Sequence, residues 1–362
     1  MKINVLQRLV KYSLISLLLV ATVGSCSRAI KNPQQPISKG STISSSSKVD
    51  NLQQPISKGS TISSSSKAES SAFQKPQKKL MFPRLQIAIT NAIPGWNKNL
   101  MVDNVPYDLY IPPHYSNSPL LPCILVLPGW NFSRTSWVKN TFLVEYAEQY
   151  GYALILPEMG KTLYESSYYP QTRMKWNRVP GGQFIKDRFI PTIQQRHKLL
   201  RPGQYNTILG LSTGGRGVAL IALQNPGLFG SGASLSGDFS QEHMPEDRLM
   251  TAVYGAFAKF PERWTGPGSD NPQAQVRDWQ MPLYLAHGTA DNIVPESQSR
   301  LFYEALKKAH GNMIPIEYYA VIGARHNYQF WEGQLKDVLR FFNEIRAPQS
   351  VKFPVVDDWS LE

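Results

Sequence analysis

A serine in a glycine-rich turn is the first candidate for chemistry in this chain. Residues 207–223 read TILGLSTGGRGVALIAL, which combines a short apolar run, a turn that contains Ser212, and a segment with helical periodicity. The pentapeptide GLSTG at 210–214 fits the pattern G-x-S-x-G, in which a nucleophilic serine is held on a tight turn between a strand and a helix. The flanking glycines allow the strand and the helix to approach without side-chain collisions. The pentapeptide is weak alone, and its context supplies the specificity.

A phosphate-binding loop is a rival interpretation of the same residues. Gly210 and Gly215 have the spacing of the pattern G-x-x-x-x-G-K-[ST], but Arg216 and Gly217 stand where that pattern requires Lys and then Ser or Thr. The lysine would contact the phosphates and the hydroxyl would bind Mg²⁺. Because both are missing, we do not expect nucleotide binding.

A serine nucleophile needs a general base, and the chain contains six histidines. His326 lies past the final predicted strand, in VIGARHNY. His287 directly follows another strand, but the residues after it show a different pattern, with Asp291 in a loop just past the strand end. The chain order is then Ser212, Asp291 and His326. All three lie in loops at the carboxyl ends of predicted parallel strands, where side chains from distant segments converge, so we predict a Ser-His-Asp triad.

Other interpretations of the acid and the base remain open. Asp238, past the strand SGASLS, is an alternative acid. Asp291 could instead be an acid at a helix N-terminus, where carboxylates are favoured by the helix dipole. His326 could be a surface or structural histidine.

The elements that must position these residues alternate between strand and helix. Strands are predicted in VPYDLYI, PCILVLPGW, YALILPE, YNTILGLS, SGASLSGD, MPLYLAHGTAD and IEYYAVIGARH. Helices are predicted within 136–151, 183–200, 215–226, 296–309 and 331–346. This alternation predicts an α/β fold with a mostly parallel sheet covered on both faces. Residues 240–280 break the rhythm and are rich in Pro, Gly and aromatic residues, which predicts an insertion over the sheet edge.

The positive charge of the chain is concentrated at its N-terminal end. The whole chain has 38 Lys and Arg against 26 Asp and Glu, a net charge of +12. Residues 1–80 hold 12 of the basic residues and two of the acids, so residues 81–362 hold 26 against 24, a net charge of only +2. A nucleic-acid-binding domain would cluster its charge on a folded face. We therefore expect no nucleic acid as a partner.

Residues 1–26 have the features of a secretory signal. Three basic residues precede the apolar run SLISLLLVATVG, which is too short for a comfortable membrane span. Cys26 follows Val23-Gly24-Ser25, which is similar to a bacterial lipobox and predicts lipid attachment at Cys26 after cleavage; ordinary signal cleavage nearby is the alternative. We expect an exported protein, either a cell-envelope lipoprotein held at the membrane by this anchor or a secreted protein.

Residues 27–80 predict a disordered tether between this signal and a catalytic domain at 81–362. The segment QQPISKGSTISSSSK occurs twice, at 34–48 and 53–67. Its Ser, Lys, Gln and Gly offer too little apolar surface to offset the entropy lost on ordering.

The only cysteine besides Cys26 is Cys123, inside the apolar CILVL, where a buried and inert thiol is expected.

The span from about residue 105 to 346 resembles serine esterases of the α/β-hydrolase fold. The motifs YDLYIPPHY, LPCILVLPGW, LGLSTGGRGVALIALQNPGLF, LYLAHGTADNIVP and GARH are similar to landmarks of the branch that contains esterase D (S-formylglutathione hydrolase), feruloyl esterases and polyhydroxybutyrate depolymerases. The resemblance implies that Ser212 is the nucleophile, His326 the base and Asp291 the orienting acid. This chemistry requires no cofactor and no metal.

One departure from the family pattern concerns the loop that would stabilise the oxyanion. The family usually has His-Gly after its second landmark strand, where this chain has Pro128-Gly129. An oxyanion hole needs only backbone N–H groups, so those of Trp130 and Thr213 can still supply it. The missing histidine leaves open what supports this loop.

The function that we expect is hydrolysis of small-molecule or polymer carboxylic esters through an acyl-enzyme. Trp176, Tyr168 and Trp279 are predicted to line the substrate pocket, although most aromatic residues belong to cores. Three alternatives remain: a serine peptidase of the prolyl-oligopeptidase type, an acyltransferase, and a catalytically silent hydrolase-fold binding protein.

Overall fold

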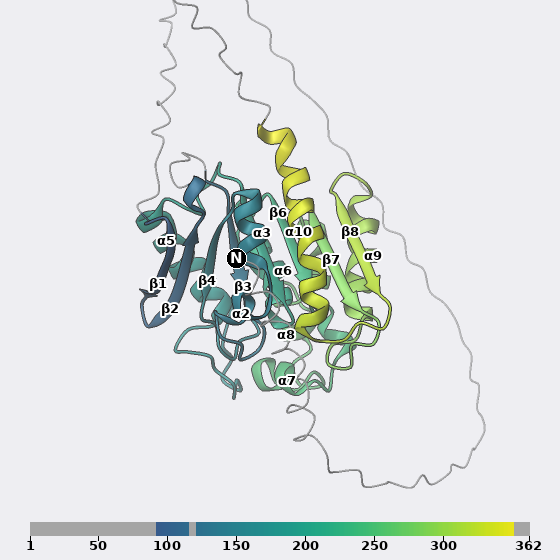
Figure 1. Ribbon diagram of the computed structural model, residues 1–362. Helices are drawn as coiled ribbons and strands as arrows, with labels where there is room; N and C mark the ends of the chain where they lie inside the picture. Colours follow the sequence, from purple (N-terminus) through teal and green to yellow (C-terminus); the bar gives the residue numbers. More distant parts are fainter. Residues whose placement is uncertain (1–91, 116–120, 351–362) are drawn as a thin grey trace, which may run out of the picture. The chain divides into compact units, whose positions relative to one another are not determined.

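The computed structural model describes residues 92–115 and 121–350 of the chain (Figure 1). The signal, Cys26 and the duplicated tether, all predicted within residues 1–80, lie outside the described residues. Among the residues that are described, no helix is both long enough and apolar enough to cross a membrane.

The described residues form one eight-stranded sheet in the order β1-β2-β4-β3-β5-β6-β7-β8. The strands are β1 (Gly95–Val102), β2 (Val105–Ile111), β3 (Cys123–Leu127), β4 (Ala153–Pro157), β5 (Asn206–Leu211), β6 (Ser231–Leu235), β7 (Leu283–Gly288) and β8 (Ile316–Val321). The pairs β1–β2 and β2–β4 are antiparallel, and the five remaining pairs are parallel. The central strands are continuous apolar runs because both faces of the sheet are covered. The chain therefore has the predicted α/β fold.

Helices pack on both faces of this sheet. They are α2 (Ser136–Asn140), α3 (Leu143–Tyr150), α4 (Gly181–Phe184), the π-turn η2 (Ile185–Phe189), α5 (Ile190–His197), α6 (Thr213–Gln224), α7 (Arg248–Tyr254), α8 (Glu262–Thr265), α9 (Ser297–His310) and α10 (Tyr328–Ser350), with short 3₁₀ turns η1 (Pro113–Tyr115), η3 (Gln241–His243) and η4 (Pro272–Asp278). One apolar core lies between the sheet and α4, η2, α5, α6 and α9, and the other between the sheet and α2, α3 and α10. Figure 1 shows α3 and α10 on the near face.

Two local features differ from the sequence prediction. Strand β1 was not predicted, because the polar residues 97–99 interrupt its apolar alternation; the register shifts there, and Asn99 has a positive φ of 57°. The single helix predicted over 136–151 is two helices, because Thr141 takes an extended conformation. The Thr141 hydroxyl donates a hydrogen bond to the carbonyl of Trp137 at 2.6 Å, in competition with the helical backbone.

The predicted insertion at 240–280 contains η3, α7, α8 and η4. Together with the loop from β4 to α4, it packs around a third, smaller apolar cluster that includes Leu163, Tyr254 and Trp264. Helices α7 and α8 lie at the lower end of the sheet in Figure 1, below the carboxyl ends of the parallel strands.

Candidate active site

Ser212 lies on a strained turn between β5 and α6. Its φ of 54° and ψ of −126° lie outside the regions that L-residues ordinarily adopt, at a cost of roughly 1–3 kcal/mol. Two glycines permit the turn: a Cβ on Gly210 would lie 2.1 Å from the carbonyl oxygen of Gly214, and a Cβ on Gly214 would lie 2.5 Å from that of Leu127. The local sequence thus holds the Ser212 hydroxyl at the carboxyl end of β5.

The structure brings the three residues of the predicted triad into hydrogen-bond contact. The Nε2 atom of His326 lies 2.9 Å from Ser212 Oγ, and its Nδ1 atom lies 2.7 Å from Asp291 Oδ2. The side chain of Asp291 is fully buried, and that of His326 is 9% exposed. A carboxylate accepts a hydrogen bond from Nδ1–H, which leaves Nε2 able to accept the proton of the serine hydroxyl.

Asp291 is held as a carboxylate by donors on both of its oxygens. Its Oδ1 accepts hydrogen bonds from the backbone N–H groups of Ile293 and Val294, at 2.9 and 3.0 Å. Burial raises the pKa of Asp291, but the hydrogen bonds from His287 and His326 outweigh burial and lower the pKa well below its ordinary value. The group is therefore ionised at neutral pH and can orient the imidazole of His326.

His287 is a buried neighbour of Asp291 that the sequence reasoning did not identify as a site residue. Its Nε2 lies 3.3 Å from Asp291 Oδ2 and 3.0 Å from the carbonyl oxygen of Val294, and its Nδ1 lies 2.7 Å from Ser299 Oγ. The serine hydroxyl can donate to Nδ1, so Nε2–H faces both oxygens. The available signal was its position at the end of β7, four residues before Asp291.

Trp331 forms one wall beside the base. Its ring packs edge-on against the imidazole of His326, with the ring centroids 5.1 Å apart. Its indole N–H donates to Ser236 Oγ at 3.2 Å, which fixes the ring on the sheet. No local sequence signal distinguishes Trp331 from an ordinary core tryptophan on α10.

The backbone of the predicted oxyanion loop lies directly beside the serine. A Cβ on Gly129 would lie 3.2 Å from Ser212 Cβ and 2.7 Å from Leu211 Cδ1, so the approach requires glycine. Within the described part of the chain, the N–H groups of Trp130 and Thr213 make no hydrogen bond. Two backbone donors are therefore available next to Ser212.

The side chain of Tyr164 supports the loop in which Pro128 stands instead of histidine. The Tyr164 hydroxyl donates to the carbonyl oxygen of Pro128 at 2.8 Å. The N–H of Asn131 donates to the carbonyl of Gly160 at 2.8 Å, which ties the loop to the segment after β4. Tyr164 is itself fully buried, so the brace is rigid.

Asp238, the alternative acid, is not in contact with His287 or His326. Its carboxylate lies 3.2 Å from Nη1 of Arg216, and both side chains are buried. Arg216 also donates to Gln241 and to the backbone carbonyl of Asp270. Arg216 thus joins α6 to the insertion, and Asp238 is the buried partner of its charge, so the prediction that Asp238 could serve as the acid is wrong.

The predicted pocket residues Trp176 and Tyr168 lie together on the loop between β4 and α4. The ring of Trp176 lies 3.2 Å from the position of a Cβ on Gly160, which accepts the hydrogen bond from Asn131. The hydroxyl of Tyr168 accepts the N–H of Trp176 at 2.9 Å, and burial raises the pKa of this phenol to about 12. Trp176 thus lies beside the oxyanion loop, and Tyr168 braces the segment that holds it.

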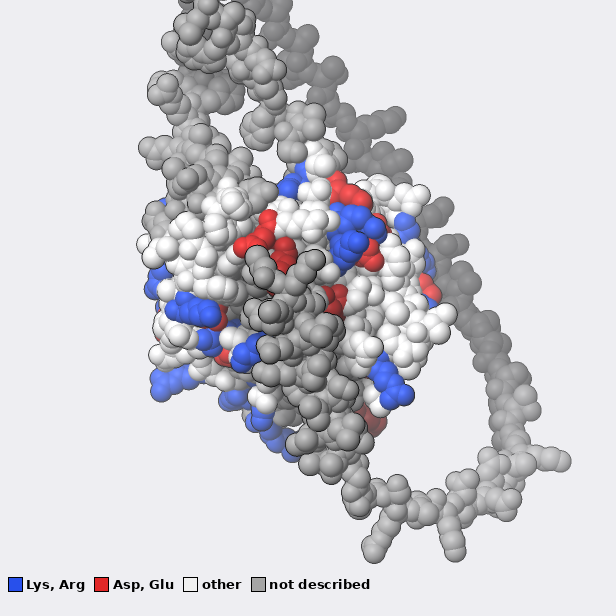
Figure 2. All heavy atoms as spheres, viewed as in Figure 1, with Lys and Arg blue, Asp and Glu red and all other residues white. Residues whose placement is uncertain are grey.

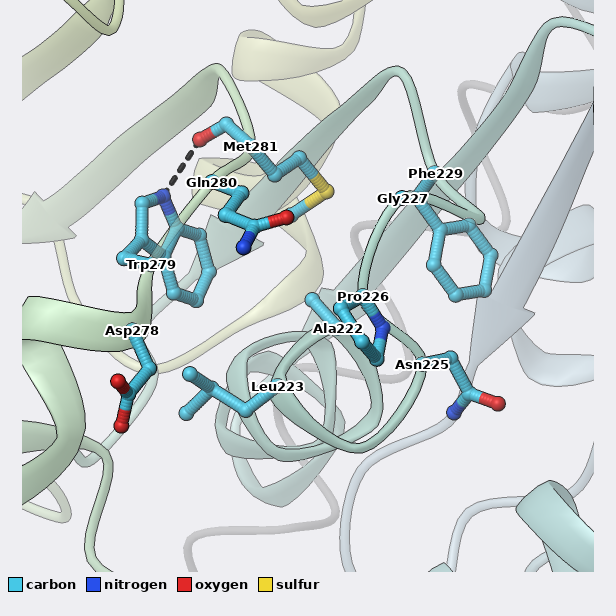
Figure 3. Close-up of a pocket in the computed structure, with 10 residues that line it drawn as sticks. All are labelled: Ala222, Leu223, Asn225, Pro226, Gly227, Phe229, Asp278, Trp279, Gln280 and Met281. Carbon is cyan, nitrogen blue, oxygen red and sulfur yellow. Dashed lines mark hydrogen bonds between the residues drawn. The ribbon is translucent and has the colours of Figure 1, made fainter. Parts of the chain in front are cut away.

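The prediction for Trp279 is wrong. Trp279 is 2% exposed, and its indole N–H donates to the carbonyl of Met281. It precedes β7 and therefore lies at the amino end of the strands, where it lines a cavity of about 90 Å³ with Phe229, Met281 and the end of α6 (Figure 3). Ser212 is at the other end of α6, about 18 Å away along a helix of 12 residues.

The remaining candidate groups for metal or thiol chemistry are few. Among the described residues, no cluster of three or more His, Cys, Asp or Glu side chains could hold a metal ion. The thiol of Cys123 is fully buried beside Asn206, and burial raises its pKa to about 12. Such a thiol is unreactive, as predicted.

Comparison with known proteins gives the same fold and an enzyme family. The family model described as Esterase matches residues 99–342. Feruloyl esterase B from Neurospora crassa is 26% identical over 262 residues, which cover 66% of this chain and 83% of that protein.

Two solved structures share the fold at low sequence identity. An S-formylglutathione hydrolase from Agrobacterium tumefaciens aligns with a TM-score of 0.55 and 19% identity, over 70% of this chain and 97% of its own. FphF, a fluorophosphonate-binding serine hydrolase of Staphylococcus aureus, aligns with a TM-score of 0.53 and 18% identity, over 69% of this chain and 99% of its own. Since the family match spans about two thirds of the chain, the protein belongs to the Esterase family and is a carboxylic ester hydrolase of the α/β-hydrolase fold.

Proposed function

We propose that this enzyme hydrolyses carboxylic esters with Ser212 as the nucleophile, His326 as the general base and acid, and Asp291 as the orienting carboxylate. The observation that carries the proposal is the pair of hydrogen bonds made by one imidazole, 2.9 Å to Ser212 Oγ and 2.7 Å to Asp291 Oδ2. Both distances are within the reach required for proton transfer and for fixing the tautomer.

In the acylation step, Ser212 Oγ attacks the ester carbonyl carbon while His326 Nε2 takes the hydroxyl proton. Asp291 stabilises the imidazolium that forms. The carbonyl oxygen becomes an oxyanion, which the N–H groups of Trp130 and Thr213 would stabilise. When the tetrahedral intermediate collapses, the bond to the leaving oxygen breaks, and His326 gives its proton to that oxygen. The products are a free alcohol and an acyl-serine.

In the deacylation step, a water molecule repeats the attack on the acyl-serine. His326 takes a proton from the water, the oxyanion forms at the same two N–H groups, and the proton returns to Ser212 Oγ. The carboxylic acid then leaves, and the free enzyme is restored. Because the same groups act in both steps, loss of any one of them slows both steps.

Turnover of the full-length protein and its Ser212→Ala variant on p-nitrophenyl acetate, butyrate and octanoate tests this proposal. Removal of the nucleophile should lower kcat by roughly 10⁶, to near the uncatalysed background. Ser234→Ala is the matched control, because Ser234 is buried on the neighbouring strand β6, and this variant should keep most of its turnover. Equal turnover by wild type and Ser212→Ala would contradict the proposal.

We also propose that the enzyme is exported and held at the cell envelope through a lipid on Cys26. The basic start, the short apolar run and the lipobox-like Val23-Gly24-Ser25 support this. A Ser-rich coil over 27–80 would span on the order of 40 Å, enough to hold the enzyme clear of a membrane surface. Cell fractionation tests the proposal: Cys26→Ala should move the enzyme out of the membrane fraction, and unchanged partitioning would contradict lipidation.

A further inference from the structure

The loop between β4 and α4 carries an excess of exposed positive charge. Residues 160–180 contain four basic side chains and one acid, Glu165. Glu165 is only 1% exposed and accepts hydrogen bonds from the hydroxyl of Thr162 and the N–H of Leu163. The four basic side chains are all exposed, and none of them forms an ion pair within the described residues; they are Lys161, Arg173, Lys175 and Arg178.

A short series of contacts connects these cations to the serine. Gly129 packs against Ser212 Cβ, and two residues later the N–H of Asn131 donates to the carbonyl of Gly160 at 2.8 Å. The ring of Trp176 then packs on Gly160. Lys161 directly follows Gly160, and Lys175 directly precedes Trp176, so both cations lie on the segments that contact the oxyanion loop.

The backbone of the loop is held in place, so an ordered segment carries its four cations. The hydroxyl of Tyr168 accepts the N–H of Trp176 at 2.9 Å and donates to the carbonyl of Val179 at 3.2 Å. The backbone N–H groups of Arg173 and Met174 both donate to the carbonyl of Ala252 on α7. Such a fixed array of cations can recognise anions without the cost of ordering a mobile loop.

A further exposed cation lies on the other side of the serine. Arg325 directly precedes His326, is exposed, and makes no ion pair within the described part of the chain. It follows β8, whereas the basic loop follows β4, and β5 with Ser212 lies between those strands in the sheet. Positive charge therefore flanks the nucleophile from two sides.

This charge is not a general property of the folded part. Residues 160–180 have a net charge of +3, whereas residues 81–362 as a whole have only +2, so the remainder has −1. The insertion at 240–280 has four basic residues and six acids, a net charge of −2. Figure 2 shows Lys and Arg side chains gathered along the lower left of the molecule, with few Asp or Glu side chains beside them.

Most acids of the insertion at 240–280 are engaged in contacts of their own. Asp247 caps the N-terminus of α7, where it accepts two backbone N–H groups. Glu242 accepts a hydrogen bond from the Asn271 amide, and Glu262 lies 3.6 Å from Arg263. Glu246 and Asp278 are exposed without such a partner among the described residues, and Asp278 lies before β7, at the amino end of the strands.

We propose that this basic rim binds the carboxylate groups of an acidic polymer, and that the ester cleaved at Ser212 is a substituent on that polymer. The inference rests on the proposed function of Ser212. Several cations spread along the loop and across the site match a chain with repeated anionic groups better than a small molecule with one. Arginine recognises carboxylates through paired hydrogen bonds, and the field of the loop raises the local concentration of such a chain.

Two polymers with the same reacting group test the proposal: O-acetylated polygalacturonate, which carries carboxylates, and O-acetylated xylan, which is neutral. The loop variant of the full-length protein replaces Lys161, Arg173, Lys175 and Arg178 with Gln. The control variant makes the same change at four exposed cations outside this loop: Lys186, Arg277, Lys308 and Lys336. The readout is the ratio of kcat/KM on the acidic polymer to kcat/KM on the neutral one.

We expect this ratio to fall by about tenfold or more in the loop variant and to stay near the wild-type value in the control. The wild-type ratio should also fall steeply as salt is raised, because the Debye length shrinks from about 30 Å at 0.01 M to about 3 Å at 1 M. An unchanged ratio in the loop variant, or an equal fall in the control, would overturn the proposal.

The membrane is the other anionic surface that the rim could contact. If the loop variant kept the wild-type ratio but lost binding to vesicles that contain phosphatidylglycerol, the proposal would be wrong, and the basic rim would instead bind an anionic lipid surface. Turnover of p-nitrophenyl acetate separates this proposal from the proposed function. Suppose that Ser212→Ala abolishes turnover of p-nitrophenyl acetate but that the loop variant keeps the wild-type polymer ratio. The enzyme would then be an esterase that uses Ser212, and the proposal of an acidic polymer as substrate would be wrong.

Discussion

The imidazole of His287 lies with its Nε2 3.3 Å from Oδ2 of Asp291, and both side chains are fully buried. This is the oxygen that also accepts the hydrogen bond from His326, so His287 helps to fix the direction of the carboxylate. His287→Gln should therefore lower kcat by up to about 100-fold with little change in KM, since a small misplacement of the acid is transmitted to the base. Steady-state kinetics on p-nitrophenyl acetate measures this.

The matched control for His287→Gln is Ser299→Ala. Ser299 contacts only the far nitrogen of the His287 ring, at 2.7 Å, so its removal should have a smaller effect on kcat. Thermal unfolding of both variants checks that each is folded at the assay temperature. If folded His287→Gln turned over like the wild type, His287 would be a packing residue without a role in positioning Asp291.

The exchange of each candidate acid for its amide separates catalysis from stability. Asp291→Asn should lower kcat by about 10⁴, because an amide cannot stabilise the imidazolium and favours the wrong tautomer of His326. Asp238→Asn should leave kcat nearly unchanged but lower the free energy of unfolding by roughly 3 kcal/mol, because it leaves the buried Arg216 without its carboxylate partner. Kinetics and urea unfolding of the two variants test this, and a large loss of kcat in Asp238→Asn alone would reverse the assignment.

Gly129 tests the oxyanion loop without touching the serine. In Gly129→Ala the new methyl group would lie 2.7 Å from Leu211 Cδ1 and 3.2 Å from Ser212 Cβ, so the loop must move away. Displacement of the Trp130 N–H should lower kcat by about 10²–10³, the cost of one oxyanion donor. Gly333→Ala on α10 is the control: nothing lies within 4 Å of its new methyl group, and kcat should not change. Comparable losses in both variants would show that the effect is not specific to the loop.

The lowered pKa of Asp291 predicts how stability depends on pH. A carboxyl group whose pKa is lower in the folded state stabilises the protein fully above its unfolded pKa, about 3.9, and this contribution is lost as the pH falls towards the folded value. The difference in unfolding free energy between wild type and Asp291→Asn should therefore be larger at pH 7 than at pH 3. Urea unfolding at both pH values measures it, and a difference that is the same at both would contradict the prediction.

The parallel part of the fold was predictable from sequence, and the irregular parts were not. Runs such as Cys123–Leu127 are apolar throughout because both faces of the sheet are covered, and that pattern is visible without a structure. Strand β1 was not predicted because the bulge around Asn99 interrupts its alternation of apolar and polar residues. The break between helices α2 and α3 at Thr141 depends on one side-chain hydrogen bond, which cannot be predicted from the periodicity of apolar residues.

The meeting of Ser212, Asp291 and His326 was predictable for the same reason, since loops after parallel strands share one edge of the sheet. Trp279 was wrongly assigned to the pocket because the prediction used only its aromatic side chain. Its position before β7 places it at the amino end of the strands. The position of His287 four residues before Asp291 was visible in the sequence, but the contact between them depends on how the loop to Val294 folds back over the ring.

Covalent labelling with a fluorophosphonate probe tests the central claim most directly. The probe reacts with an activated serine, so mass spectrometry of the labelled full-length protein should find a single adduct, on the peptide that contains Ser212. The adduct should be absent from Ser212→Ala and strongly reduced in His326→Ala, where the base that activates the hydroxyl is missing. An adduct on another residue, or an unlabelled wild type that is fully folded, would contradict the account.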